Sequence, residues 1–173
     1  MNVVRAANAA DIPAIAAIYA HHILHGLASF EEVPPDGAEL LRRFEDVQAR
    51  GLPYVVAEVD GAVRGYAYAS PFRLRSAYRF TVEDSVYLHH EWHRRGLGRQ
   101  LLDRVIAACT AKGMRQMIAV IGDSGNLGSI GLHQACGFSM TGTFHATGFK
   151  FGRWVDTVMM QRALGPGDTT LPG

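Results

Sequence analysis

The residue types best suited to chemistry follow one another between positions 83 and 99. Segment 83–88 (EDSVYL) alternates like a strand and begins with two carboxylates, and segment 94–99 (RRGLGR) is typical of a tight turn that opens a helix. Such a turn directs several backbone N–H groups to one spot, with the positive end of the helix dipole behind them. Gly96 and Gly98 remove side chains where an anion must approach the backbone. The pattern predicts a pyrophosphate site, to which Arg94, Arg95 and Arg99 add charge.

The same residues also fit a glycine turn that leads into an arginine-rich, solvated helix end. The stretch lacks the third glycine of a dinucleotide motif, and G-x-x-x-x-G-K-[ST] occurs nowhere in the chain. Segment 89–93 (HHEWH) misses the zinc pattern H-E-x-x-H, because Arg94 stands where the second histidine belongs. His21, His22 and His25 are interpreted as a helix surface without a complementary ligand set. We therefore expect no metal.

Composition narrows the class of protein. The chain has 173 residues, and 17 basic against 16 acidic side chains give a net charge of +1, which argues against nucleic acid or an anionic membrane as partner. Its apolar runs are shorter than the roughly 20 residues of a membrane helix. The N-terminal segment lacks the features of a signal peptide, so we expect a cytoplasmic protein. Cys109 and Cys136 are interpreted as buried free thiols.

Hydrophobic periodicity predicts a mixed α/β domain. Asp60-Gly61 between two apolar runs is a strong hairpin signal, and Asp36 with Glu39 forms the start of a capping box. The strand–helix–strand unit around segment 94–99 adds parallel pairing to an antiparallel sheet. The apolar run 117–121 suits a strand covered on both faces. We expect one domain over 1–164 and a flexible tail over 165–173. Strands are predicted at 2–6, 54–59, 62–69, 80–88, 117–121, 138–145 and 151–161, and helices at 12–23, 36–51, 97–112 and 126–136.

A second motif gives the first one a context. Segment 126–138 reads N-x-x-S-x-x-L-H-x-x-x-G-F. A strand, R-R-G-x-G, a long helix, a strand and this motif together resemble the acetyl-coenzyme A site of the GNAT superfamily of N-acetyltransferases. Segments 28–31 (ASFE), 81–88 (TVEDSVYL), 119–121 (AVI) and 148–156 (GFKFGRWVD) are similar to the phosphinothricin and methionine sulfoximine N-acetyltransferase group. The resemblance runs from about Arg5 to Leu164.

The resemblance implies a mostly antiparallel central sheet with flanking helices, whose splayed central strands hold acetyl-CoA. It also implies which groups bind that cosubstrate: the main chain of three strand residues for the pantetheine arm, the backbone of the arginine–glycine turn for the pyrophosphate, and one asparagine at the start of the next helix. The superfamily pattern has Gln or Arg three residues before the first glycine, where this chain has His93. The resemblance therefore implies a backbone cradle here but no contribution from that side chain. The cofactor-binding candidates are Val86, Tyr87, Leu88, Arg94, Arg95, Gly96, Leu97, Gly98, Arg99 and Asn126.

Glu83 is the candidate catalytic base. Strand alternation places it on one face with Ser85 and Tyr87, while Asp84 points to the opposite face. An α-ammonium is protonated at pH 7, so a base assists acetyl transfer, and the resemblance places the family's base here. The alternative is an exposed strand carboxylate. The resemblance places His133 where many members of the superfamily carry a tyrosine near the cofactor sulfur. The histidine would either protonate the thiolate or only contact the cofactor. A backbone N–H near Tyr87 is the expected oxyanion donor.

The acceptor site is predicted from a loop and two aromatic residues. A guanidinium fork suits a carboxylate, phosphinate or sulfone oxygen, and one of Arg73 and Arg75 is expected to bind it. Phe30 and Phe72 are candidates for an apolar wall, with core packing as the alternative. The substrate-binding candidates are Phe30, Phe72, Arg73, Arg75, Glu83 and Ser85.

The sequence thus predicts an enzyme that moves an acetyl group from acetyl-CoA to the α-amine of a small amino-acid-like substrate, such as methionine sulfoximine, methionine sulfone or phosphinothricin. The resemblance also implies a homodimer. Acetylation of a polyamine, an aminoglycoside or a protein terminus is the rival activity, and the arginine-rich loop 73–79 argues against a polycation. A non-catalytic acetyl-CoA sensor is the rival from another class. A flavodoxin-like protein ranks third, since the central hairpin fits a parallel sheet poorly.

Overall fold

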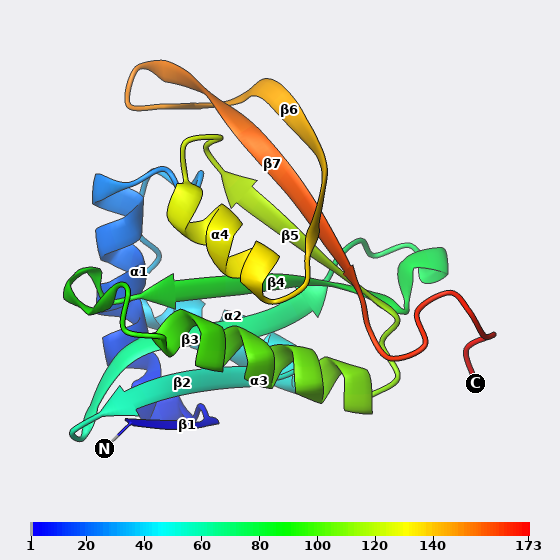
Figure 1. Cartoon of the computed structure of the whole chain (residues 1–173). Coiled ribbons are helices and arrows are strands. Elements are labelled where there is room, and N and C mark those ends of the chain that lie inside the picture. Colours follow the sequence, from blue (N-terminus) through cyan, green and yellow to red (C-terminus); the bar gives the residue numbers. More distant parts are fainter. Residues whose placement is uncertain (1) are drawn as a thin grey trace.

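A computed structural model describes residues 2–173, which form one seven-stranded sheet in the order β1-β2-β3-β4-β5-β7-β6 (Figure 1). β4 and β5 are parallel, and every other pair of neighbouring strands in this sheet is antiparallel. This is the mixed, mostly antiparallel sheet that the sequence predicts. The strands are β1 (Asn2–Ala6), β2 (Tyr54–Val59), β3 (Ala62–Pro71), β4 (Thr81–Leu88), β5 (Gln116–Gly122), β6 (Ser139–Lys150) and β7 (Arg153–Ala163), and the helices are α1 (Ile12–His25), α2 (Gly37–Ala49), α3 (Leu97–Ala111) and α4 (Leu127–Ala135).

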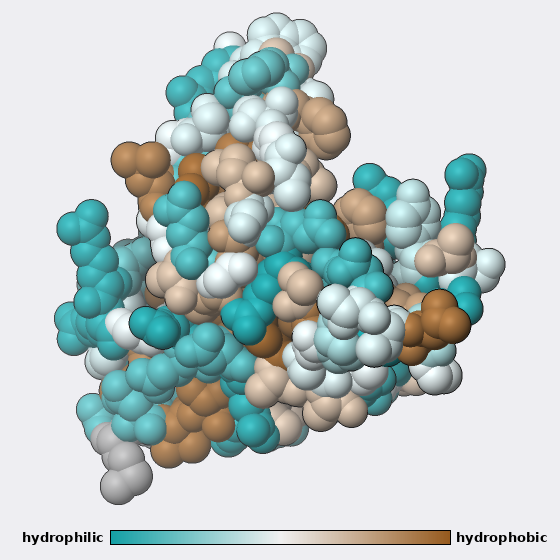
Figure 2. Space-filling view, turned by 45° about the vertical axis from the view of Figure 1, so that its right-hand side comes forward, coloured by the Kyte–Doolittle hydropathy of each residue, from teal (hydrophilic) through white to brown (hydrophobic). Residues whose placement is uncertain are grey.

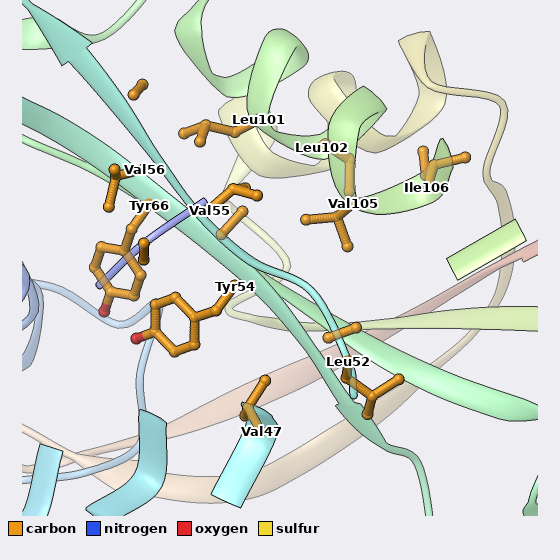
Figure 3. Close-up of a cluster of buried hydrophobic side chains, with 14 of the residues drawn as sticks. Val47, Leu52, Tyr54, Val55, Val56, Tyr66, Leu101, Leu102, Val105 and Ile106 are labelled. Atoms are coloured by element: carbon orange, nitrogen blue, oxygen red, sulfur yellow. The ribbon is translucent and has the colours of Figure 1, made fainter. Parts of the chain in front are cut away.

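The helices cover both faces of the sheet. α1 and α2 pack on one face, and α3 and α4 lie on the other (Figure 1). The apolar stripe of α3 points at β2 and β3, with Leu101, Leu102 and Val105 fully buried (Figure 3). On the opposite face, Tyr54 and Tyr66 pack with their rings stacked 6.0 Å apart. Buried side chains therefore pack on both faces of the sheet and hold β3 and β4 in place. This packing fixes the position of β4, the strand that carries the predicted base.

Most element boundaries lie within two residues of the prediction, and the largest difference is at the end of β6. β6 continues past His145 to Lys150, because a bulge between Phe144 and Gly148 lets it keep pairing with β7. The hairpin closes at Phe151 and Gly152, both with positive φ, as a two-residue turn requires.

β5 is not covered on both faces along its whole length, since Val120 is 39% exposed. The tail over 165–173 receives hydrogen bonds from the Arg115 guanidinium at Gly167 O, Thr170 Oγ1 and Leu171 O.

The centre of the sheet opens between β4 and β5. The two strands pair only from Thr81 with Gln116 to Asp84 with Ala119. Beyond that point β5 continues along β7, while β4 continues along β3 as far as Leu88 opposite Gly65. Within residues 2–173, segment 85–88 therefore has a strand partner on one edge only. The splayed central strands that the resemblance implies are confirmed.

One glycine shows how closely the loop after α1 lies against this opening. A Cβ added at Gly122 would lie 2.1 Å from the carbonyl oxygen of Leu27, so the loop must move to admit a side chain. We predict that Gly122→Ala lowers the free energy of unfolding by about 1–3 kcal/mol, the usual cost of overpacking. Gly142→Ala, in β6, is the matched control, because nothing lies within 4 Å of its Cβ position. Urea denaturation of both variants measures this; an unchanged Gly122→Ala would show that the loop yields freely.

Candidate active site

A cleft of about 730 Å³ opens where β4 and β5 part. Its walls come from the end of β4, the turn before α3, the start of α4 and the loop that follows α1. Eight of the ten predicted cofactor-binding residues line it: Val86, Tyr87, Leu88, Arg94, Gly96, Gly98, Arg99 and Asn126. The structure thus brings together residues that are up to 40 positions apart in the chain and that the sequence assigns to one ligand.

The N-terminus of α3 forms the anion-binding part of the cleft. Gly96 precedes the helix with φ +79°, and no side chain caps the helix start, so the first N–H groups of α3 have no partner within the helix. The first turn carries no acidic residue that would offset the positive end of the dipole. At Gly98 an added Cβ would lie 3.2 Å from Leu132, which explains the absence of a side chain. These features suit a pyrophosphate.

Two residues of the predicted turn point away from the cleft. Leu97 is 1% exposed and packs in the core, and the Arg95 guanidinium lies 4.5 Å from the centre of the Trp92 ring. Only the backbone of these two residues could therefore face the cleft. Asn126 caps α4, accepting a hydrogen bond from Ser129 N at 3.2 Å. Arg94 and Arg99 are therefore the two arginines that line the cleft, where the acidic Asp123 also lies, and Arg99 is 3.6 Å from Asp103.

The free edge of β4 has one partner that the sequence does not reveal. His22 Nε2 donates to the carbonyl oxygen of Leu88 at 2.7 Å, from α1. This bond occupies one of the main-chain groups assigned to the pantetheine arm and leaves those of Val86 and Tyr87. The periodicity of α1 marks His22 as a surface residue, and no local signal links it to a residue 66 positions away.

The histidines of α1 meet a second group of histidines in the turn after β4. The His21 ring stacks on His90 with centroids 4.1 Å apart, and His89, His90 and Glu91 bring ligand-type atoms within 4.8 Å of one another. The sequence interpretation, which left the α1 histidines without complementary groups, missed this contact. Burial and the neighbouring histidines lower the pKa of His21, and burial lowers that of His22 against the hydrogen bond to Leu88. Near pH 7 the rings of His21 and His22 are therefore neutral and contribute hydrogen-bonding groups to this region rather than positive charge.

Glu83 lies half-buried in β4, on the face that carries Tyr87. Tyr87 packs 5.1 Å from Tyr19 of α1, whereas Asp84 contacts α4, so alternation assigns the two faces as predicted. Burial, then the charge of Asp84, raises the pKa of Glu83 to about 6, while Arg73 opposes the shift. A carboxyl group with this pKa is ionised at neutral pH and accepts a proton readily, as a general base requires.

His133 and Asp84 form a buried pair on the other face of β4. His133 Nε2 lies 2.9 Å from Asp84 Oδ2, and Nδ1 lies 2.7 Å from the carbonyl oxygen of Ser129. Burial lowers the pKa of His133, but Asp84 and the Ser129 carbonyl outweigh burial, so the pKa is raised. The sequence singled out His133 and gave Asp84 little weight. The structure shows that the two side chains are in direct contact.

The predicted acceptor residues lie in separate places. Arg73 packs over the Phe72 ring at 4.5 Å, and its charge acts on Glu83. Arg73 and Arg75 both line a cavity of about 260 Å³ beside the end of β4. Phe30 is 40% exposed and lies over Gly148, where an added Cβ would be 2.5 Å from its ring. Ser85 lines a small cavity of about 50 Å³ with Asp84 and His133. Of the two arginines, Arg73 is the one whose charge reaches Glu83.

Comparisons with known proteins agree with this geometry. Residues 4–159 match the model of the acetyltransferase (GNAT) domain. The chain is 59% identical over 162 residues to a phosphinothricin N-acetyltransferase of Alcaligenes faecalis, covering 94% of this chain and 82% of that one. It is 40% identical over 161 residues to an L-methionine sulfoximine/L-methionine sulfone acetyltransferase of Salmonella typhimurium, covering 93% and 94%. The crystal structure of a phosphinothricin acetyltransferase from Sinorhizobium meliloti in complex with AcCoA matches with a TM-score of 0.97 and 51% identity, covering 99% of this chain and 93% of that one. No helix within residues 2–173 is long and apolar enough to cross a membrane.

The raised pKa of Glu83 has a consequence for stability. An acid whose pKa rises from 4.5 to about 6 on folding binds more protons in the folded state between these values, so stability falls as pH rises through this window. We predict that Glu83→Gln raises the free energy of unfolding at pH 8 by about 1–2 kcal/mol, at 1.36 kcal/mol per pKa unit. The gain should vanish near pH 4. Urea denaturation at both pH values measures it, and a loss of stability at pH 8 would contradict the burial argument.

Proposed function

The chain belongs to the GNAT family of acetyltransferases, and from this premise we propose that it acetylates the α-amine of a small amino-acid-like acceptor, with acetyl-CoA as acetyl donor. The acceptors named for its relatives, phosphinothricin and methionine sulfoximine or sulfone, define the proposed class. One observation carries this proposal: a half-buried carboxylate with a pKa of about 6 lies on the strand whose free edge lines the cleft.

The residues of the cleft fit the donor. The unpaired N–H groups of α3 and the positive φ of Gly96 suit a pyrophosphate. The Val86 and Tyr87 main chain has no strand partner on the cleft side and suits the amides of a pantetheine arm. Acetyl-CoA supplies an activated thioester when bound. The acceptor supplies the amine, and the protein supplies the base and the hydrogen-bond donors.

Glu83 removes the proton that blocks the reaction. An α-ammonium has no lone pair, so it must lose a proton before it can attack a carbonyl carbon. Ionised Glu83 accepts this proton, directly or through a water molecule. A backbone N–H near Tyr87 then stabilises the negative charge that develops on the acetyl oxygen as the amine nitrogen bonds to the carbonyl carbon, because a fixed amide needs little reorganisation. The carbon–sulfur bond breaks, and the departing thiolate takes up the proton that the nitrogen loses, which gives the amide and free thiol.

The acceptor's acidic group is assigned to Arg73. This guanidinium packs over the Phe72 ring, and its charge acts on Glu83, which places a positive charge near the base. A carboxylate, phosphinate or sulfone oxygen suits its planar fork. The same positive charge disfavours polyamines and aminoglycosides, which were the rival acceptors.

We further propose that the protein is a cytoplasmic homodimer. The β6–β7 hairpin rises above the body of the molecule and carries exposed aromatic side chains, with Phe149 57% and Trp154 68% exposed and their rings 5.1 Å apart (Figure 1). It forms the upward projection in Figure 2, where brown and pale residues lie among teal ones. Exposed aromatic side chains on a projecting hairpin suit contact with a second copy of the chain. The two free, buried cysteines suit a reducing compartment.

Glu83→Gln tests the proposed base. We expect thiol release from acetyl-CoA with methionine sulfoximine or phosphinothricin and little with spermidine. In the variant, kcat should fall by about 10²–10⁴, the usual contribution of a general base, with unchanged Kd for acetyl-CoA. The acidic limb of the wild-type kcat profile should be centred near pH 6. Equal turnover by the variant would remove the assignment; binding without turnover on any amine would favour a sensor.

Arg73 and Arg75 form a matched pair for testing acceptor recognition. Removing a charge-assisted hydrogen bond to an acidic group costs about 1.5–3 kcal/mol, or about 10- to 150-fold in binding. We expect Arg73→Met to raise KM for the acceptor by this factor, and Arg75→Met to change it by less than about threefold, within the range of a surface contact. Steady-state kinetics at saturating acetyl-CoA measure both. The reverse order would move the assignment to Arg75.

A further inference from the structure

We propose that Asp84 is a positioning residue: it holds the His133 ring as an imidazolium with both N–H groups bound, so that the positive member of a fixed ion pair lines the small cavity that adjoins the cleft. This inference deepens the proposed function and rests on it for the meaning of the cleft. The ionisation state itself is carried by the contacts of the two side chains.

Both ring nitrogens of His133 must be donors. A backbone carbonyl accepts hydrogen bonds and cannot donate them, so Nδ1 carries the proton of the 2.7 Å contact to Ser129 O. An ionised carboxylate likewise only accepts, so Nε2 carries the proton of the 2.9 Å contact to Asp84 Oδ2. A ring with two N–H groups is an imidazolium. Neither proton is directed at a thiolate, in contrast to a freely placed proton donor.

The surroundings favour this charge state over a neutral pair. The side chains of His133 and Asp84 are 5% and 1% exposed, where removing either partner leaves the other uncompensated. His133 lies in the last turn of α4, where the helix dipole favours a cation. The Phe138 ring packs edge-on at 5.0 Å and shields the pair from water.

The pair lines a small cavity that adjoins the cleft. Asp84, Ser129 and His133 line the cavity of about 50 Å³, and Tyr87, Gly122, Asn126 and Ser129 are among the residues that line both this cavity and the large cleft. Asp84 Oδ1 is buried and makes no hydrogen bond within residues 2–173. The hydrogen bond from His133 to Oδ2 is therefore the one strong contact of this carboxylate among the described residues.

Two titratable groups outside the pair, Glu83 and Cys109, respond to the charge of Asp84. Glu83 lies on the opposite face of β4, and the charge of Asp84 raises its pKa. Cys109 of α3 is buried nearby, and burial, aided by Asp84, raises the pKa of its thiol to about 12, so it stays neutral. Asp84 is the charged group whose contact raises the pKa of His133. Without Asp84, burial dominates and the ring becomes neutral near pH 7.

Asp84→Asn separates a positioning role from a merely structural one. In ¹⁵N-histidine-labelled wild-type protein, we expect both His133 nitrogens to show protonated shifts at pH 7–8. In Asp84→Asn, one nitrogen should show the neutral shift at the same pH, and Asp84→Glu should restore the protonated form. His133→Gln identifies the signals, and His145→Gln, at a side chain that is 81% exposed, is the control that should change neither. A protonated His133 in Asp84→Asn would overturn the proposal.

A double-mutant cycle tests whether Asp84 acts through His133. We expect Asp84→Asn and His133→Gln each to lower kcat about tenfold or more, as loss of a preorganised electrostatic group does. The double variant should be no slower than the slower single variant, because groups that act as a unit are not additive. It should also unfold at higher urea than His133→Gln, which leaves a buried carboxylate unpaired. Multiplying losses would overturn the proposal. If the wild type transferred no acetyl group, the proposed function would fail, while the NMR comparison would still decide the ionisation state.

Discussion

The parting of β4 from β5 after Asp84 is the constraint on which the rest of the structure depends. An unpaired strand edge inside a sheet leaves backbone donors and acceptors that must find partners. The end of β4 keeps β3 on one side and, at Leu88, the His22 ring on the other. The remaining groups face a cleft that the N-termini of α3 and α4 also border. A place where the sheet is incomplete thus becomes a place where an extended, amide-containing ligand can complete it.

Two neighbouring carboxylates on β4 acquire different properties because the strand alternates. Glu83 faces the α1 side, where partial burial raises its pKa to about 6 and leaves it able to accept a proton. Asp84 faces α4, where His133 neutralises it. Burial disfavours the charged form of either carboxylate. For Asp84 the positive charge of His133 compensates burial, whereas for Glu83 burial is expressed as a raised pKa. Reactivity therefore follows from which face each residue occupies.

The sequence predicted the elements and the cleft well, because both rest on local patterns. The glycine turn, the helix caps and strand alternation place Gly96, Asn126 and Glu83 without knowledge of the fold. The contacts that join distant segments carry no local signal: His22 to Leu88, His133 to Asp84, and the fully buried Lys150, whose Nζ donates to Gly26 O and Ser29 O. Sheet register and helix docking decide these contacts, and alternation alone leaves Asp84 looking like a minor candidate.

Amide hydrogen exchange with and without acetyl-CoA tests most directly whether the open edge of β4 is the donor-binding site. Binding should slow exchange in segment 85–88 and at the start of α3, where N–H groups without partners would acquire them. Segment 81–84, already paired with both β3 and β5, should change little. Protection confined to other parts of the chain, with saturable binding and no change at 85–88, would contradict the account.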